Sequence, residues 1–292
     1  MFGFINIYKP EKMTSFDVIA ILRGITHIKQ IGHSGTLDPF ATGVLPVCIG
    51  KSTRLIEYLD DDKEYIATIK FGADTDTYDL EGRIVKTYET KISKSQLEMV
   101  LNNFKGEIEQ YPPKYSAIKV NGKKLYEYAR KGQDVEIKPR KVFIFKIELL
   151  EFDEQNQIAK IIIKCSKGTY IRSIAYDIGQ KLNCGGHLIA LERTKAGKFT
   201  IENAIKLDDI KGENDVKEHL INPIDVLSGN KYTLNEKEKE KVKHGIALNI
   251  SEQKQFREFY DSIVFLIYGG KIIAVGQINN KEIRIRKVFE VL

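Results

Sequence analysis

Residue types that could do chemistry gather in a turn-rich segment around residue 38. His33, Ser34 and Asp38 are the types that a hydrolytic triad uses, but the segment lacks the G-x-S-x-G turn that exposes a serine nucleophile. A carboxylate held in an ordered loop can instead act alone as an acid, a base or a nucleophile. The other interpretation is that Asp38 only caps a turn, which is the usual role of a lone aspartate in a loop.

Other possible sites are weaker. Gly50, Lys51 and Ser52 resemble the end of a phosphate-binding loop, but Leu45 stands where that motif requires a glycine. No H-E-x-x-H motif or acidic metal cluster occurs, and the aspartates at 60–62 are typical of a solvated helix end. The cysteines are far apart and form no C-x-x-C pair, which predicts buried apolar side chains at Cys48, Cys165 and Cys184.

Positive charge is concentrated in one stretch, although the net charge of the chain is only +6. Between Gln110 and Lys146 there are ten lysines and arginines against three acidic residues. Four tyrosines are interleaved with them: Tyr111, Tyr115, Tyr126 and Tyr128. This combination is typical of surfaces that neutralise phosphates and stack on bases. The stretch indicates a nucleic-acid partner, and a solvated basic face is the alternative.

The first elements that must position Asp38 can be predicted from local pattern. Residues 4–8 form an apolar strand that ends before Pro10. Thr14 or Ser15 then caps a helix with apolar residues at helical spacing, namely Phe16, Ile19, Leu22 and Ile25. The Gly, Pro, Ser and Thr residues of 32–46 predict a loop.

The following segments predict a sheet with few helices. Residues 65–71 alternate as a strand, and 83–88 can return as its partner after a turn. Ser93 and Gln96 form a capping box for a helix that Gly106 ends. Further strands are expected at 141–151 and 158–165, a helix at 170–182 and a surface connection at 208–219.

Length and composition favour about two domains. The chain has 292 residues, of which 42% are apolar and 29% charged. No apolar run approaches the roughly 18 residues of a membrane helix, and the first residues lack a signal-peptide pattern, so we expect a cytoplasmic protein. A boundary near Gly229 separates a smaller part with a helix at 235–244 and strands at 262–268, 271–278 and 282–291.

Several sequence blocks, in order, resemble the bacterial tRNA pseudouridine-55 synthases. They are GHSGTLDPFATGVLPVCIGKSTR from residue 32, TDTYDLEG from 75, YPPKYSAIKVNGKKL from 111 and SKGTYIRS from 166. The resemblance extends over most of residues 3–228 and includes Tyr65. One departure is Glu192, because family members commonly carry two consecutive arginines there, and this puts a cationic contact in doubt.

The resemblance implies a reaction. The family isomerises uridine in RNA by breaking the N1–C1′ bond, turning the base and joining C5 to C1′. Asp38 matches the family carboxylate, which can trap or stabilise positive charge on the sugar. Arg172 matches the arginine that pairs with it, and Tyr170 matches the tyrosine proposed to accept the C5 proton. No atom is gained or lost, so neither a cofactor nor a metal is implied.

The resemblance also implies substrate contacts. Tyr65 matches the tyrosine that stacks on the base, and His33 matches the residue beside the extruded nucleotide. The remaining residues expected to bind substrate are Lys9, Asp79, Leu191, Lys123, Lys124, Arg130 and Lys131.

The fold implied is α+β. A catalytic domain at 1–228 has a large mixed, mostly antiparallel sheet, flanking helices and a thumb insertion at about 110–140. A small β-barrel-like PUA domain that binds RNA follows at 229–292, and its net charge of +4 suits that role. We refer to residues 110–140 as the basic insertion.

The implied partner is tRNA, held by its TΨC stem-loop and acceptor stem. A monomer is expected, with no membrane contact and no required protein partner. Two alternatives remain open: a noncatalytic RNA-binding or RNA-folding protein, and the same isomerisation on another RNA.

Overall fold

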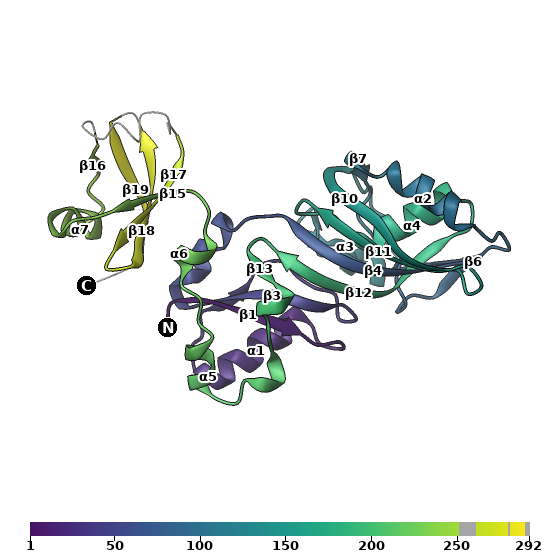
Figure 1. The fold of residues 1–292 in the computed structure, drawn as a ribbon, viewed down its shortest axis with the longest axis horizontal. Coiled ribbons are helices and arrows are strands. Elements are labelled where there is room, and N and C mark those ends of the chain that lie inside the picture. Colours follow the sequence, from purple (N-terminus) through teal and green to yellow (C-terminus); the bar gives the residue numbers. More distant parts are fainter. Residues whose placement is uncertain (251–260, 280, 290–292) are drawn as a thin grey trace.

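The structure is a computed structural model that describes residues 1–250, 261–279 and 281–289. It consists of a larger part built on one mixed sheet and a smaller part built on a second sheet near the C-terminus (Figure 1). Within these described ranges, no helix has the length and apolar character needed to cross a membrane.

The large sheet runs through the whole of the larger part. Most neighbouring strands are antiparallel, and the pairs β1–β14 and β3–β12 are parallel. The expected mixed, mostly antiparallel sheet is therefore confirmed. Its strands are, in order, β14 (Ile205–Lys206), β1 (Gly3–Lys9), β3 (Thr42–Ile49), β12 (Gly186–Ala196), β4 (Lys63–Phe71), β11 (Ile158–Cys165), β10 (Arg140–Asp153) and β7 (Gly106–Gln110), with β2 (Ile31–His33) on β3 and β13 (Phe199–Thr200) on β12.

Helices cover this sheet because alternate strand residues bury one face. The buried residues of β4 pack with those of α2 (Lys94–Asn102) and α4 (Ile171–Lys181) in one core cluster. The first helix, α1 (Ser15–Thr26), joins β1, β3 and the short α5 (Glu213–Glu218) in another. The site described below lies where these two halves of the sheet meet at β12 (Figure 1).

The first helix has the expected start, and Ile19, Leu22 and Ile25 lie on the expected apolar face, but Phe16 does not. Thr14 is the N-cap and forms a capping box with Asp17. Phe16, which we expected on the buried face, is 62% exposed and lies under the guanidinium of Arg23. The prediction for Phe16 was wrong because the buried apolar residues of α1 start at Val18, so the Phe16 side chain points away from the sheet.

Two local predictions near α2 were also wrong. Residues 84–87 form β6 (Ile84–Thr87), which pairs with β5 (Ala73–Thr75) in a separate hairpin and not with β4. The edges of β4 are taken by β11 and β12, so no edge remains for a local partner. The α2 helix keeps its predicted capping box, but it ends at Asn102, and Gly106 starts β7.

The segment predicted as one loop, 32–46, is partly strand. The loop itself is residues 34–41, and β3 begins at Thr42. Pro46 fits inside β3 because β12 pairs only with its first two residues and β2 only with its last three. On that side the carbonyl of Pro46 accepts the backbone N–H of Ser34, so the missing proline donor breaks no ladder bond.

Other elements complete the larger part. The acidic connection at 208–219 holds α5, and the cysteines are buried and unpaired as expected. The basic insertion between β7 and β10 contains β8 (Lys119–Val120), β9 (Lys123–Lys124) and α3 (Leu125–Arg130). Short 3₁₀ helices lie at Gly50–Tyr58, Ile201–Asn203 and Leu207–Asp209.

The C-terminal part is a five-stranded sheet, reached through α6 (Pro223–Val226). The helix expected at 235–244 is confirmed as α7 (Glu236–Lys243), with Asn235 as its N-cap. The last expected strand ends at Val288, and residues 290–291 of that prediction lie outside the described ranges. The strand order is β15 (Asn230–Thr233), β17 (Ile263–Tyr268), β18 (Lys271–Asn279), β19 (Glu282–Val288) and β16 (Leu248–Asn249).

Side chains of both parts share one hydrophobic cluster. Phe4 and Leu55 of the larger part are buried together with Phe265, Val275 and Phe289 of the smaller part. The small sheet is therefore anchored to the larger part by packing.

Candidate active site

Hydrogen bonds from two buried side chains fix the loop that carries Asp38. Ser15 Oγ accepts the N–H of Leu37 at 2.8 Å and donates to its carbonyl at 3.2 Å. Lys9 Nζ donates to the carbonyl of Pro39 at 3.2 Å, and also to the carbonyls of Pro10 and Met13. The residues on each side of Asp38 are thus tied to β1 and to the start of α1, which limits the positions that the carboxylate can take.

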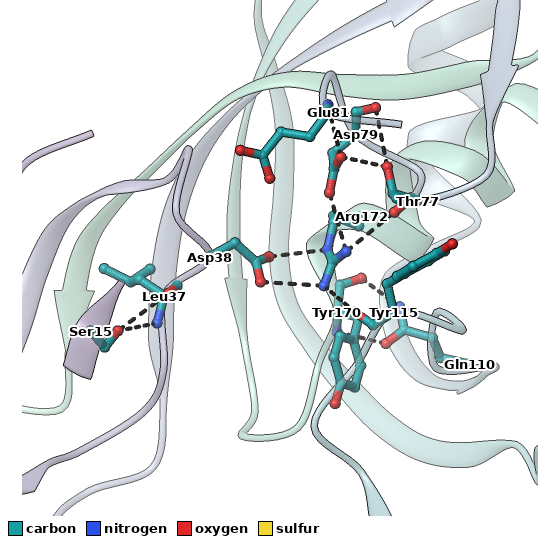
Figure 2. A network of polar contacts seen from close by, with 10 residues as sticks. All are labelled: Ser15, Leu37, Asp38, Thr77, Asp79, Glu81, Gln110, Tyr115, Tyr170 and Arg172. Atoms are coloured by element: carbon teal, nitrogen blue, oxygen red, sulfur yellow. Dashed lines mark hydrogen bonds and ion pairs between the residues drawn. The ribbon is translucent and has the colours of Figure 1, made fainter. Parts of the chain in front are cut away.

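Arg172 in the first turn of α4 holds Asp38 with two nitrogens. Its Nε lies 3.0 Å from one carboxylate oxygen and its Nη2 lies 3.3 Å from the other (Figure 2). The third nitrogen, Nη1, lies 3.1 Å from Asp79 Oδ2. Arg172 is only 6% exposed, whereas the Asp38 side chain is 35% exposed. The arginine is therefore fixed in the wall and the carboxylate faces the accessible space.

Asp79 stands behind this arginine. It is 3% exposed and accepts hydrogen bonds from Thr77 Oγ1 and the backbone N–H of Glu81 (Figure 2). This position indicates that Asp79 orients Arg172. The substrate contact that the sequence predicts for Asp79 stays a prediction. The isolated bridge between Asp79 and Leu188 ties this turn to the central strand β12.

Burial and neighbouring charges act on Asp38 in opposite directions. Burial raises the pKa of the Asp38 carboxyl, and the adjacent Arg172 guanidinium works against that rise. The charges of Asp79 and Lys9 have smaller effects of opposite sign on the pKa of Asp38. Arg172 therefore both orients this carboxylate and favours its ionised form.

Asp38 opens onto a cavity of about 400 Å³. Tyr65 on β4 and Leu191 on β12 form part of its floor, and Tyr170 and Arg172 line the α4 side. Tyr115 and Tyr126 of the basic insertion close another side. The structure thus brings together these sequence-predicted residues: Asp38, Tyr65, Tyr170, Arg172 and Leu191.

Tyr170 is the N-cap residue of α4. Gln110 holds its backbone, because Gln110 Oε1 accepts the Tyr170 N–H at 2.7 Å and Gln110 Nε2 donates to the Tyr170 carbonyl at 2.9 Å (Figure 2). Burial raises the pKa of the Tyr170 phenol above its ordinary value of 10.0. A phenolate is therefore rarer here than in water, and Tyr170 needs a partner group to act as a base.

Lys9 and His33, both expected to bind substrate, are absent from the cavity lining. Lys9 is fully buried, and burial lowers its pKa to about 8. Because Lys9 Nζ donates to three backbone carbonyls, its side chain supports the loop that carries Asp38. His33 lies on β2, and burial lowers its pKa below 6.5, so it is neutral at pH 7. Their substrate contacts stay predictions.

Two of the four predicted cations of the basic insertion lie beside an aromatic ring that lines the cavity. Lys124 Nζ and the Arg130 guanidinium each lie 5.3 Å from the ring centre of Tyr126, which itself lines the cavity. Lys123 and Lys131 are exposed. This arrangement joins a basic surface to the cavity through one aromatic ring.

Two charged residues of the cavity lining were missed from the sequence: Lys63 and Arg193. The alternation of β4 carried the signal for Lys63, since it stands two residues before Tyr65. The Glu192 carboxylate accepts the Tyr8 hydroxyl at 2.7 Å, and the doubt about a cationic contact at this position stays a prediction. Among the described residues, no group of three or more His, Cys, Asp or Glu is placed to hold a metal.

Comparison with known proteins agrees with this geometry. Residues 23–171 match the TruB family pseudouridylate synthase (N terminal domain), and residues 172–227 match the tRNA pseudouridylate synthase B C-terminal domain. The chain is 42% identical over 293 residues to a protein of Clostridium tetani named tRNA pseudouridine synthase B, covering 99% of this chain and 100% of the relative. The protein of that name from Francisella philomiragia is 50% identical over 212 residues, or 72% of this chain and 70% of the relative.

The fold has solved counterparts. A crystal structure of a Cbf5-Nop10-Gar1 complex contains a chain that aligns with a TM-score of 0.70 at 25% identity, covering 99% of this chain and 85% of that one. The matched domains, the full-length relatives and the shared fold lead to one assignment: this chain belongs to the TruB family of pseudouridine synthases.

Proposed function

We propose that the protein converts uridine 55 in the TΨC loop of tRNA to pseudouridine. Its family and its relatives named tRNA pseudouridine synthase B support pseudouridine formation in tRNA. The observation that carries the proposal is the bidentate contact between Asp38 and Arg172 at the edge of a cavity floored by Tyr65. Position 55 rests on the motif resemblance around Asp38.

The geometry suits each step of this isomerisation. A uridine that enters the cavity places its base over Tyr65 and Leu191, and its sugar toward Asp38. Breaking the N1–C1′ bond develops positive charge at C1′, which the Asp38 carboxylate traps or stabilises. The base then turns, C5 bonds to C1′, and the C5 proton leaves. Tyr170, on the α4 side, is the proposed proton acceptor, assisted by a partner group because its pKa is raised.

The basic insertion is proposed to act as a thumb that closes on the RNA. Tyr126 links its cations to the cavity, and phosphate contacts can offset the few kcal/mol that base flipping costs. Residues 229–292 are proposed to be a PUA-like RNA-binding domain that reaches the acceptor stem. Its described residues form an open five-stranded sheet.

The direct test is to incubate the protein with an unmodified tRNA transcript and to map pseudouridine by carbodiimide treatment and primer extension. One stop, at position 55, is expected, and a transcript with cytidine there should show none. Absence of any stop would favour a noncatalytic RNA-binding protein. A stop only in a different RNA would favour the same chemistry on another substrate.

Tyr65 provides a first prediction. Tyr65→Phe keeps the ring and should retain tRNA affinity, whereas Tyr65→Leu should lose much of the turnover, because base stacking contributes about 1 to 3 kcal/mol. Single-turnover product formation and tRNA affinity should be measured for both variants. Equal loss of turnover in the two would show that the hydroxyl matters and the ring face does not.

The basic insertion provides a second prediction. Replacing Lys123, Lys124, Arg130 and Lys131 together with glutamine should weaken tRNA binding and flatten its salt dependence. The slope of log K against log salt should change by about 0.7 to 0.9 for each phosphate that the variant no longer neutralises. Filter binding over a range of salt concentrations measures this slope.

Glutamine at Lys91 and Lys105, exposed near α2, is the matched control that should leave the salt dependence unchanged. If the slope of log K against log salt is unchanged in the fourfold variant, the RNA does not bind at these four residues.

A further inference from the structure

Two cations lie next to Tyr65 on the floor of the cavity. Lys63 and Tyr65 are two residues apart on β4, so their side chains leave the same face of the sheet. Arg193 on β12 is paired in register with Tyr65, and Leu191 is two residues from Arg193. All four residues line the cavity. The aromatic surface offered to the base is therefore bordered by an ammonium and a guanidinium.

Arg193 is fully buried and only partly satisfied. Its Nε donates to the carbonyl of Val44 at 2.7 Å and its Nη2 donates to the carbonyl of Gly35 at 2.9 Å. Its Nη1 is buried without a hydrogen-bond partner. The position that a Cβ would take on Gly35 lies 3.2 Å from Arg193 Nη1 and 3.0 Å from Lys63 Cε. The two cationic side chains are thus neighbours beside the loop that holds Asp38.

In the part of the chain that the structure describes, neither Lys63 nor Arg193 forms an ion pair with a carboxylate. Lys63 Nζ donates to the backbone carbonyl of Asp61 at 3.3 Å. The nearby carboxylates are engaged by other lysines, Asp61 by Lys167 and Asp62 by Lys164. Burial and the Arg193 charge lower the pKa of Lys63, and Asp61 and Asp62 have smaller effects in the opposite direction. A buried guanidinium beside a half-buried ammonium is costly when neither has an ion-pair partner, so the two cations in one cavity point to an anion that arrives with the substrate.

We propose that Lys63 and Arg193 hold the negative charge of the uracil base after its bond to the sugar has broken. This inference rests on the proposed pseudouridine formation and assigns the base its own binding groups. Heterolysis leaves the electron pair of the N1–C1′ bond on the base, as a uracil anion delocalised over its ring and carbonyl oxygens. Asp38 meanwhile carries or stabilises C1′.

The remaining steps balance. C5 of the anion bonds to C1′ and releases it from Asp38, C5 loses its proton, and N1 takes one up. While it is detached, the base must turn without leaving the cavity. Charge held by Lys63 and Arg193, with stacking on Tyr65, keeps it in place during that turn.

The competing source of negative charge is a phosphate on either side of the flipped nucleotide. The same cations could bind that group, but the effect would then appear in affinity and not in the chemical step. Tyr65 and Leu191 beside the cations favour the base, because a phosphate gains nothing from an aromatic and apolar floor.

The test compares Lys63→Gln with wild type and with Lys91→Gln, an exposed control outside the cavity lining. Substrates are tRNA and tRNA carrying one uncharged methylphosphonate on either side of the target uridine. For Lys63→Gln we expect a tRNA affinity within about twofold of wild type and a single-turnover rate about 100-fold lower on every substrate. Arg193→Lys should keep more of that rate than Arg193→Gln, and thermal melting identifies variants that do not fold.

Two results would overturn the proposal. One is an unchanged single-turnover rate in Lys63→Gln. The other is a loss confined to affinity that disappears on one methylphosphonate RNA, which would assign the pair to that phosphate. If wild type itself formed no pseudouridine, the proposed function would fail, and this outcome is visible in the same assay before any variant is compared.

Discussion

Replacing Asp38 with asparagine is expected to abolish pseudouridine formation without unfolding the protein. The amide is nearly isosteric and can still accept a hydrogen bond from Arg172, so a turn-capping role would survive with a loss of about 1 kcal/mol or less. The chemistry would not survive, because an amide supplies no negative charge opposite C1′. We expect the single-turnover rate to fall by at least about 1,000-fold.

Binding separates the catalytic from the structural interpretation of Asp38. Asp38→Asn removes a carboxylate from a surface that receives phosphates, so its affinity for tRNA should equal or exceed that of wild type. Purified Asp38→Asn should be assayed for tRNA affinity, melting temperature and single-turnover product. Product formation at more than a few per cent of the wild-type rate would return the noncatalytic RNA-binding protein to contention.

Replacing Arg172 with lysine is also expected to lower turnover strongly. The guanidinium spans Asp38 and Asp79 at once, with three nitrogens in contact, and a single ammonium cannot reproduce this geometry. We expect turnover to fall by about 100-fold, because the carboxylate loses its fixed orientation. Lysine keeps a positive charge between the two aspartates, so the variant avoids the unpaired buried charge that an apolar residue would leave.

The pH profile distinguishes positioning from a general loss of stability in Arg172→Lys. Arg172 works against the raised pKa of Asp38, so a weaker contact should let that pKa rise further. The acid side of the rate profile should then move to higher pH, since the ionised carboxylate is the active form. Arg83→Lys, at an exposed ion pair with Asp76, is the control that should keep the wild-type profile. A wild-type rate and pH profile in Arg172→Lys would show that the bidentate contact between Arg172 and Asp38 is dispensable.

Local signals allowed much of the fold to be predicted from the sequence. The capping residues Thr14, Ser93 and Asn235 start their helices as expected, because capping involves only a few neighbouring residues. Period-two alternation identified β4 and β11, since each buries one face.

The elements that were missed depend on contacts far apart in sequence. The central strand β12 was not predicted, because bulges after Leu188 and Arg193 interrupt its alternation and a buried arginine stands where an apolar residue would be expected. Residues 84–87 were paired with β4 instead of β5, because distant strands occupy both edges of β4. Which strand borders β4 is decided by β11 and β12, which lie about a hundred residues later in the chain.

The site shows the same division. Asp38, Tyr170 and Arg172 were found through short motifs whose resemblance covers them directly. Arg193 becomes visible only when β12 pairs with β4 and places it beside Tyr65. Asp79 could be identified from its motif, but its position behind Arg172 required the packing of the turn after β5 against α4.

The hydrophobic cluster shared by Phe4, Leu55, Phe265 and Phe289 fixes the position of the small sheet relative to the larger part. Backbone carbonyls of the small sheet reinforce it, as Lys51 Nζ donates to Phe289 and Arg54 donates to Val288. Moving the small sheet would expose this apolar surface to water, so it cannot follow a shorter or differently bent RNA at low cost. If the small sheet binds RNA as proposed, the fixed span from the Asp38 cavity to this sheet selects an RNA by its dimensions as well as by its bases.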